Sequence, residues 1–131
     1  MATENNQLIP GADHSIPVKE AKEMTKLFRE SRDIILIPEL RGKDILSICE
    51  TFNRESFDRI LRQEACVAVR IYFGMTPEKK VRVIAVGVDK DNNDLLPDST
   101  STSTRDAELP PPPPPTEQGA PCPPYCPKTP L

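Results

Sequence analysis

Two cysteines near the C-terminal end are the residues whose type and spacing most plainly suggest chemistry. They enclose the motif Cys122-Pro123-Pro124-Tyr125-Cys126, a C-x₃-C spacing that differs from the C-x₂-C of zinc knuckles and thioredoxin-like redox sites. In an extended polyproline conformation the two cysteines would lie about 12 Å apart. A disulfide or a shared metal therefore requires a turn at Pro124-Tyr125 or a cis proline.

Three interpretations of this motif follow from the residues. The motif is interpreted as a disordered tail with two exposed thiols, as a local disulfide formed after export, or as half of a zinc or copper site. A second chain or Cys49 and Cys66 would complete the metal site. Both of these cysteines otherwise lie in apolar patterns typical of small buried side chains. Only the metal interpretation requires the tail to fold back onto the rest of the chain.

Arg70 and Arg82 form a second candidate site, because each alternates with apolar residues in a predicted strand. One interpretation is an anion or carboxylate pocket on one face of the sheet. The other, which we favour, is an exposed pair whose aliphatic stems cover apolar surface.

Catalytic motifs are scarce in this sequence. The single histidine, His14, lies in a polar N-terminal segment, which argues against histidine triads and HExxH zinc sites. The five glycines form neither a dinucleotide-binding fingerprint nor a phosphate-binding loop. We therefore expect a protein that is not an enzyme.

Proline dominates the end of the chain, with 11 of the 16 prolines in the last 22 residues. The six consecutive prolines Pro110–Pro115 predict a stiff rod of roughly 19 Å. Such a rod serves as a spacer, or as a ligand for an aromatic-lined groove on a partner.

Apolar periodicity predicts the elements that position these residues. Helical spacing indicates helices at about 17–31 and 54–63, and the apolar stripe of the first is expected to face the core. Alternation predicts strands at Cys66–Phe73 and Val81–Val88, joined as an antiparallel hairpin. A third strand, ending at Phe52, is expected to run parallel to the first hairpin strand through a right-handed crossover.

The predicted fold class is therefore α/β (α+β), with two helices packed on a small three-stranded sheet that contains an antiparallel hairpin. The predicted organisation is a disordered arm at 1–14, one small domain at 15–97, and a disordered Ser/Thr- and Pro-rich tail at 98–131. The second sheet face carries Ala68, Tyr72, Ile84 and Val86. It is too apolar for open solvent, so the first helix or a second copy in a homodimer should cover it.

Charge limits the classes of partner. The net charge is −3, and residues 15–97 hold 15 basic and 14 acidic residues. This balance gives no electrostatic case for nucleic acid. No apolar run approaches the ~18 residues of a membrane span, and the N-terminal segment lacks the features of a secretory signal. We expect a cytoplasmic protein, with non-classical export as the alternative.

Three segments carry a resemblance to a known family: Cys66–Met75, Val83–Leu95 and Pro121–Cys126. They resemble a family of small, uncharacterised proteins from bacteria of the Bacteroidetes group, which share a C-x-V-x-(I/V)-R-I-Y strand, a V-G-V-D turn and a C-terminal CPP-x-C motif. The chain departs from the pattern at Ala65, Ala68 and Asn93, where glycines are expected. The resemblance implies that the tail cysteines are a family feature, and it implies no activity.

These observations favour a non-catalytic binding or adaptor protein that contacts a protein partner through its proline-rich CPPYC tail. The alternative is a thiol-redox or metal-binding protein that uses Cys122 and Cys126.

Overall fold

The structure, a computed structural model, describes residues 9, 11–97, 114–116, 119–129 and 131. Most of the predicted arm and most of the predicted polyproline rod lie outside these residues. The described chain divides into two compact units, each assembled from separate segments. The first contains residues 9, 53–72, 84–97 and 114–116, and the second contains residues 11–52, 73–83, 119–129 and 131.

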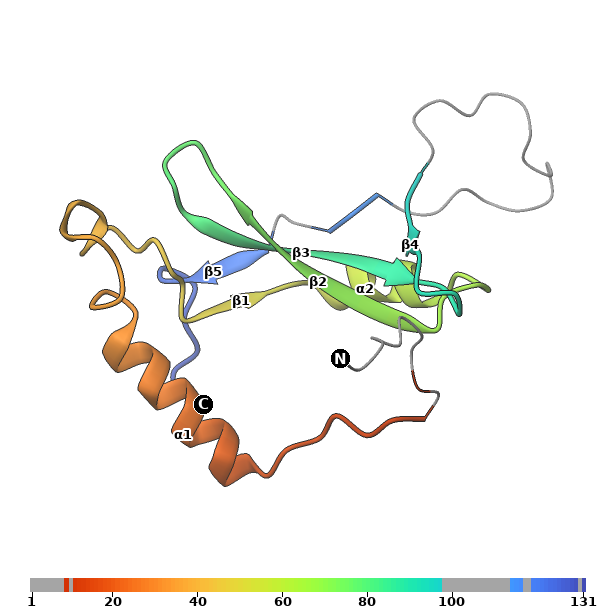
Figure 1. Cartoon of the computed structure of the whole chain (residues 1–131), viewed down its shortest axis with the longest axis horizontal. Coiled ribbons are helices and arrows are strands. Elements are labelled where there is room, and N and C mark those ends of the chain that lie inside the picture. Colours follow the sequence, from red (N-terminus) through yellow and green to blue (C-terminus); the bar gives the residue numbers. More distant parts are fainter. Residues whose placement is uncertain (1–8, 10, 98–113, 117–118, 130) are drawn as a thin grey trace, which may run out of the picture. The chain divides into compact units, whose positions relative to one another are not determined.

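The predicted mixed α/β fold is confirmed. The described residues form two α-helices, a three-stranded sheet with the order β2-β3-β4, and a two-stranded sheet of β1 and β5 (Figure 1). The elements are α1 (Val18–Ser31), a short 3₁₀ helix (Pro38–Leu40), β1 (Cys49–Thr51), α2 (Arg54–Leu61), β2 (Ala68–Met75), β3 (Val81–Val88), β4 (Asp94–Leu95) and β5 (Ala120–Cys122).

The β2–β3 hairpin forms where alternation of apolar residues predicted it (Figure 1). The strands are linked by a tight turn, in which the Thr76 N–H donates to Lys80 O at 2.9 Å and the Lys79 N–H donates to Thr76 O at 2.8 Å. The third strand of this sheet is β4, which pairs antiparallel with the end of β3.

The first unit has its core between α2 and β3. Ile60 is the buried residue of α2, and Ala85, Val86 and Val88 are buried on β3. A Cβ atom at Gly87 would lie 3.2 Å from both Cys66 Sγ and Ile60 Cγ2, so the glycine permits close packing at this point. Within the same unit, Thr116 exchanges two backbone hydrogen bonds with Ala85.

The second unit is organised around the two-stranded sheet. β1 and β5 are antiparallel, with Cys49 opposite Cys122, Glu50 opposite Pro121 and Thr51 opposite Ala120. Ile45 and Cys122 are buried in this unit. The Val81 N–H donates to Ile45 O at 2.8 Å, which ties the hairpin end to the segment before β1.

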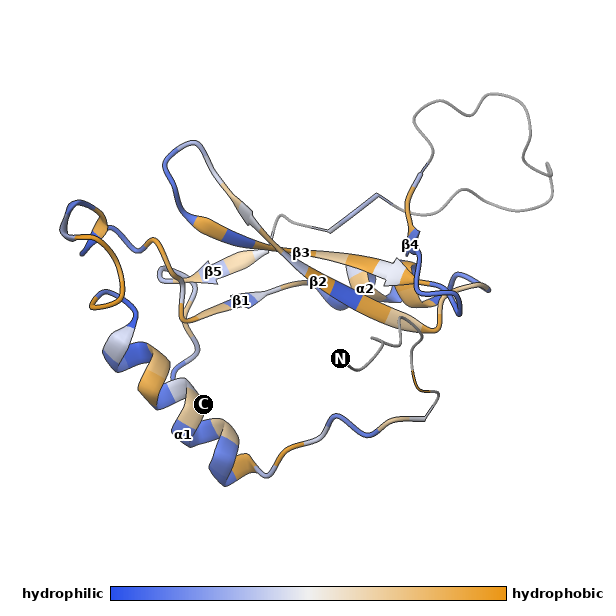
Figure 2. Ribbon diagram, in the orientation of Figure 1, coloured by the Kyte–Doolittle hydropathy of each residue, from blue (hydrophilic) through white to orange (hydrophobic). Residues whose placement is uncertain are grey.

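Two expectations about these elements were wrong. The strand near Phe52 does not run parallel to β2, because β1 pairs antiparallel with β5, whose residues lie 69 to 73 positions further along the chain. The apolar stripe of α1 does not face a core, since no residue of α1 is buried and Leu27 is 65% exposed. Hydropathy colouring shows that apolar and polar residues alternate around this helix (Figure 2). In the described part of the chain, neither helix has the length and apolar character to cross a membrane.

Candidate functional site

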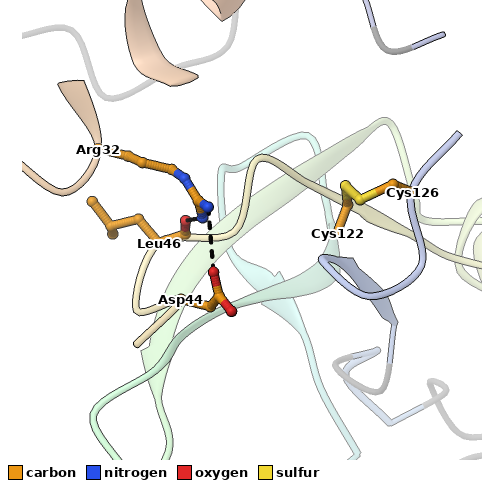
Figure 3. Close-up of a disulfide and its surroundings, with 5 residues drawn as sticks. All are labelled: Arg32, Asp44, Leu46, Cys122 and Cys126. Carbon is orange, nitrogen blue, oxygen red and sulfur yellow. Dashed lines mark hydrogen bonds and ion pairs between the residues drawn. A yellow bond between two sulfur atoms is a disulfide. The ribbon is translucent and has the colours of Figure 1, made fainter. Parts of the chain in front are cut away.

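The CPPYC motif is a closed loop at the end of β5, in the second unit. A disulfide joins Cys122 to Cys126, and their Cα atoms are 4.7 Å apart (Figure 3). The chain turns back on itself here, with cis peptide bonds before Pro123 and Pro124. The Tyr125 N–H donates to Pro121 O at 2.9 Å, and the Cys126 N–H donates to Pro124 O at 3.1 Å. Of the three interpretations of the motif, the structure has the local disulfide.

The root of this loop is buried and its tip is exposed. Cys122 is 0% exposed, whereas the Tyr125 side chain is 64% exposed. Pro124 and Cys126 are also exposed. Strand β5 fixes the root, because the Ile48 N–H donates to Cys122 O at 2.8 Å beside the β1–β5 pairing. Within the predicted tail at 98–131, the described residues 120–122 form a strand and the cysteine loop follows it.

An ion pair anchors the segment that leads into β5. Glu50 Oε1 accepts hydrogen bonds from Arg82 Nε at 3.0 Å and from Arg82 Nη2 at 2.7 Å. Arg82 Nη2 also donates to Gly119 O at 3.0 Å, and Glu50 Oε2 accepts from the Val83 N–H at 3.1 Å. The two side chains are only 6% and 21% exposed, Glu50 being the more buried. Arg82 thus links β3 to β1 and to the backbone of the tail.

Gly119 is required by this arrangement. A Cβ atom there would lie 2.8 Å from the ring of Phe52 and 2.9 Å from Glu50 Cγ. These distances are shorter than van der Waals contact, so a larger residue would displace the tail from the ion pair.

Two further contacts within the second unit hold the segments around the loop. Arg32 donates to Leu46 O at 2.6 Å and to Asp44 Oδ1 at 3.3 Å, which fixes the approach to β1 (Figure 3). Leu131 O accepts hydrogen bonds from Thr25 Oγ1 and Arg29 Nη1 on α1.

The second candidate site divides between the two units. Arg70, in the first unit, donates to Asp94 and to the side-chain oxygen of Asn92, and the Tyr72 hydroxyl donates to the other oxygen of Asp94. Hydrogen bonding by Tyr72, and then by Asp94, raises the pKa of Arg70, whereas desolvation lowers it. Arg70 and Arg82 are therefore each paired with a carboxylate of their own unit, and their side chains are 30% and 21% exposed.

Metal ligands are not gathered in the part of the chain that the structure describes. No group of three or more His, Cys, Asp or Glu residues there is arranged to hold a metal ion. Cys49 and Cys66 carry free thiols, and Cys66 Sγ donates to Ala68 O at 3.2 Å in the first unit. Cys122 and Cys126 are joined to each other, so their sulfur atoms are not thiolate ligands in this state.

Sequence reasoning missed two of the residues that build the site, Glu50 and Gly119, and it considered Cys49 only as a metal ligand or a buried side chain. The pairing of Glu50 with Arg82 joins positions 32 residues apart, and no periodicity marks such a pair. The nearest indication in the sequence was Glu50 itself, an acid within a short apolar segment. Burial of an unpaired charge costs free energy, so such an acid needs a basic partner.

Comparisons with known proteins add no further constraint. No family model, no curated protein and no solved structure matches this chain.

Proposed function

We propose that this protein is a non-catalytic binding protein and that the disulfide-closed loop Cys122–Cys126 is its contact element. The observation that carries the proposal is the exposure of Tyr125, at 64%, on a loop whose root is fully buried. A tyrosine offers a large contact area with few rotatable bonds, and it is enriched among residues that dominate binding energy.

Preorganisation supports this use of the loop. The disulfide, the two backbone hydrogen bonds and the β1–β5 pairing hold the loop in one conformation before any partner arrives. Binding then costs less conformational entropy than ordering of a free proline-rich tail would. The partner is expected to be a protein with an apolar groove that accepts a proline and an aromatic ring.

The closed loop also bears on the compartment. Disulfides persist in oxidising compartments and are rare in the cytosol. We therefore favour an oxidising compartment over the cytoplasmic location expected from the sequence. Zinc or copper binding would require reduced cysteines and further ligands. The disulfide between Cys122 and Cys126 therefore favours the thiol-redox alternative over the metal alternative.

A comparison of two exposed aromatic residues tests the proposal. Partners are recovered by affinity purification with full-length wild type, Tyr125→Ala and Phe73→Ala; Phe73 is 78% exposed and lies outside the loop. Loss of a binding hot spot of about 2 kcal/mol should reduce affinity roughly 30-fold for Tyr125→Ala. Phe73→Ala should bind like the wild type. Equal recovery with Tyr125→Ala and wild type would overturn the proposal.

A further inference from the structure

Cys122 lies next to two other cysteines in the second unit. Cys126 is its disulfide partner, at a Cα–Cα distance of 4.7 Å. Cys49 is directly opposite Cys122 in the register of β1 and β5, and it is exposed and carries a free thiol. The register therefore places a free cysteine of β1 directly across the strand pair from the disulfide.

The antiparallel register makes Cys49 a competent second partner. Residues directly opposite each other in an antiparallel pair point to the same face of the sheet, with Cα atoms about 4.5–5.5 Å apart. Disulfides form at Cα separations of about 4.4–6.8 Å. The backbone thus already satisfies the requirement for a Cys49–Cys122 bond without rearrangement of the strands.

We propose that Cys49 exchanges with the Cys122–Cys126 disulfide. The Cys49 thiol gives its proton to water, and the thiolate attacks Cys122 Sγ. The Cys49–Cys122 bond forms as the Cys122–Cys126 bond breaks, and the electron pair leaves on Cys126 Sγ, which takes a proton from water. One thiol and one disulfide give one thiol and one disulfide, so no outside oxidant or reductant is needed.

The product differs from the starting state in two ways. A bond between β1 and β5 replaces the small loop, and Cys126 becomes a free thiol at an exposed position. This thiol is then a modification site for electrophiles and for low-molecular-weight disulfides. Opening the loop would also remove the contact element. This consequence rests on the proposed function, whereas the exchange itself does not rest on it.

Cys66 supplies a matched control. It is the other free cysteine, but it belongs to the first unit, where its thiol donates to Ala68 O and lies near Ile60 and Gly87. Cys66→Ser therefore removes a free thiol without altering the proposed exchange.

The first experiment maps thiols in full-length oxidised protein. The protein is incubated without reductant, quenched at intervals with N-ethylmaleimide, digested and analysed by mass spectrometry. We expect a Cys49–Cys122 peptide to form together with labelled Cys126, because attack by the Cys49 thiolate releases the Cys126 sulfur. Both products should persist in Cys66→Ser and be absent in Cys49→Ser. Labelling of Cys126 that is equal in wild type and Cys49→Ser, or no Cys49–Cys122 peptide, would overturn the proposal.

A second variant tests the geometry separately. Cys126→Ser leaves Cys122 without its loop partner, and oxidised glutathione supplies the oxidising equivalent. We expect an intramolecular Cys49–Cys122 disulfide in dilute protein. A glutathione adduct that remains on Cys122, or a disulfide between chains, would show that the register does not bring the two sulfur atoms together.

Discussion

Glu50→Gln is the substitution that best tests how the tail is held on the fold. It keeps the shape of the side chain and an oxygen acceptor but removes the charge that pairs with Arg82. Breaking a buried ion pair costs about 3–5 kcal/mol. Because Arg82 is 21% exposed and keeps its bond to Gly119 O, we expect a smaller loss of about 2–3 kcal/mol in the free energy of unfolding. The Tm should fall by roughly 10–20 °C.

Thermal unfolding of Glu50→Gln, beside Asp58→Asn, measures this effect. Asp58 pairs with Arg54 on the surface of α2, and both side chains are exposed. An exposed pair of this kind contributes about 0.5 kcal/mol or less. Equal losses of Tm in the two variants would refute the reasoning. A double-mutant cycle with Arg82→Gln should give a coupling energy of about 1–2 kcal/mol.

Hydrogen exchange shows whether the loss is local to the tail. The Ile48 N–H donates to Cys122 O, and its protection should fall in Glu50→Gln as the tail loosens. The Val67 N–H, which donates to Val88 O in the first unit, should keep its protection. A uniform fall at both amides would mean that the ion pair stabilises the whole chain and not the tail in particular.

Two further predictions test packing. Gly119→Ala should lower stability by about 1–3 kcal/mol in urea unfolding, because the added methyl group meets the ring of Phe52 and the stem of Glu50; an unchanged midpoint would show that the tail is not seated there. Leu27→Ala should change stability by about 0.5 kcal/mol or less, since Leu27 is exposed. A loss of about 2 kcal/mol or more, with a change in mass by light scattering, would instead show that a second copy covers α1.

The hairpin was predictable because its strands are long and adjacent in the sequence. Alternation over residues 66–73 and 81–88 defines two strands with a short connection, and such strands pair with each other. The two helices were predictable for a similar reason, since their apolar residues recur at helical spacing. Both are local patterns, and local patterns are what a single sequence displays most clearly.

The partner of β1 could not be predicted in this way. Its partner strand β5 is only three residues long, Ala120-Pro121-Cys122, and it has no alternation and no β-branched residue. Pro121 cannot donate a backbone hydrogen bond, which normally argues against a strand. In a two-stranded sheet every strand is an edge, so one proline is tolerated there.

The surroundings of each helix face and of each strand side chain were the second feature that could not be predicted from the sequence. The periodicity of α1 shows which residues share a face, but it does not show what lies against that face. No residue of α1 is buried in the structure, so the prediction that this face would be buried was wrong. The same limit applies to Arg70 and Arg82, whose strand positions were clear and whose carboxylate partners were not.

The tail shows how a short motif acquires a structural role from distant residues. Its cysteine spacing identified the loop, but spacing alone allowed free thiols, a disulfide or a metal site. The structure has the disulfide, and the register that sets Cys49 opposite Cys122 and the ion pair that reaches Gly119 hold the segment from which the loop begins. If Glu50→Gln loosens the tail, the same variant should also slow formation of the Cys49–Cys122 bond, because exchange requires the two strands to remain in register. A variant that loses tail protection and still exchanges at the wild-type rate would separate the two roles of β5.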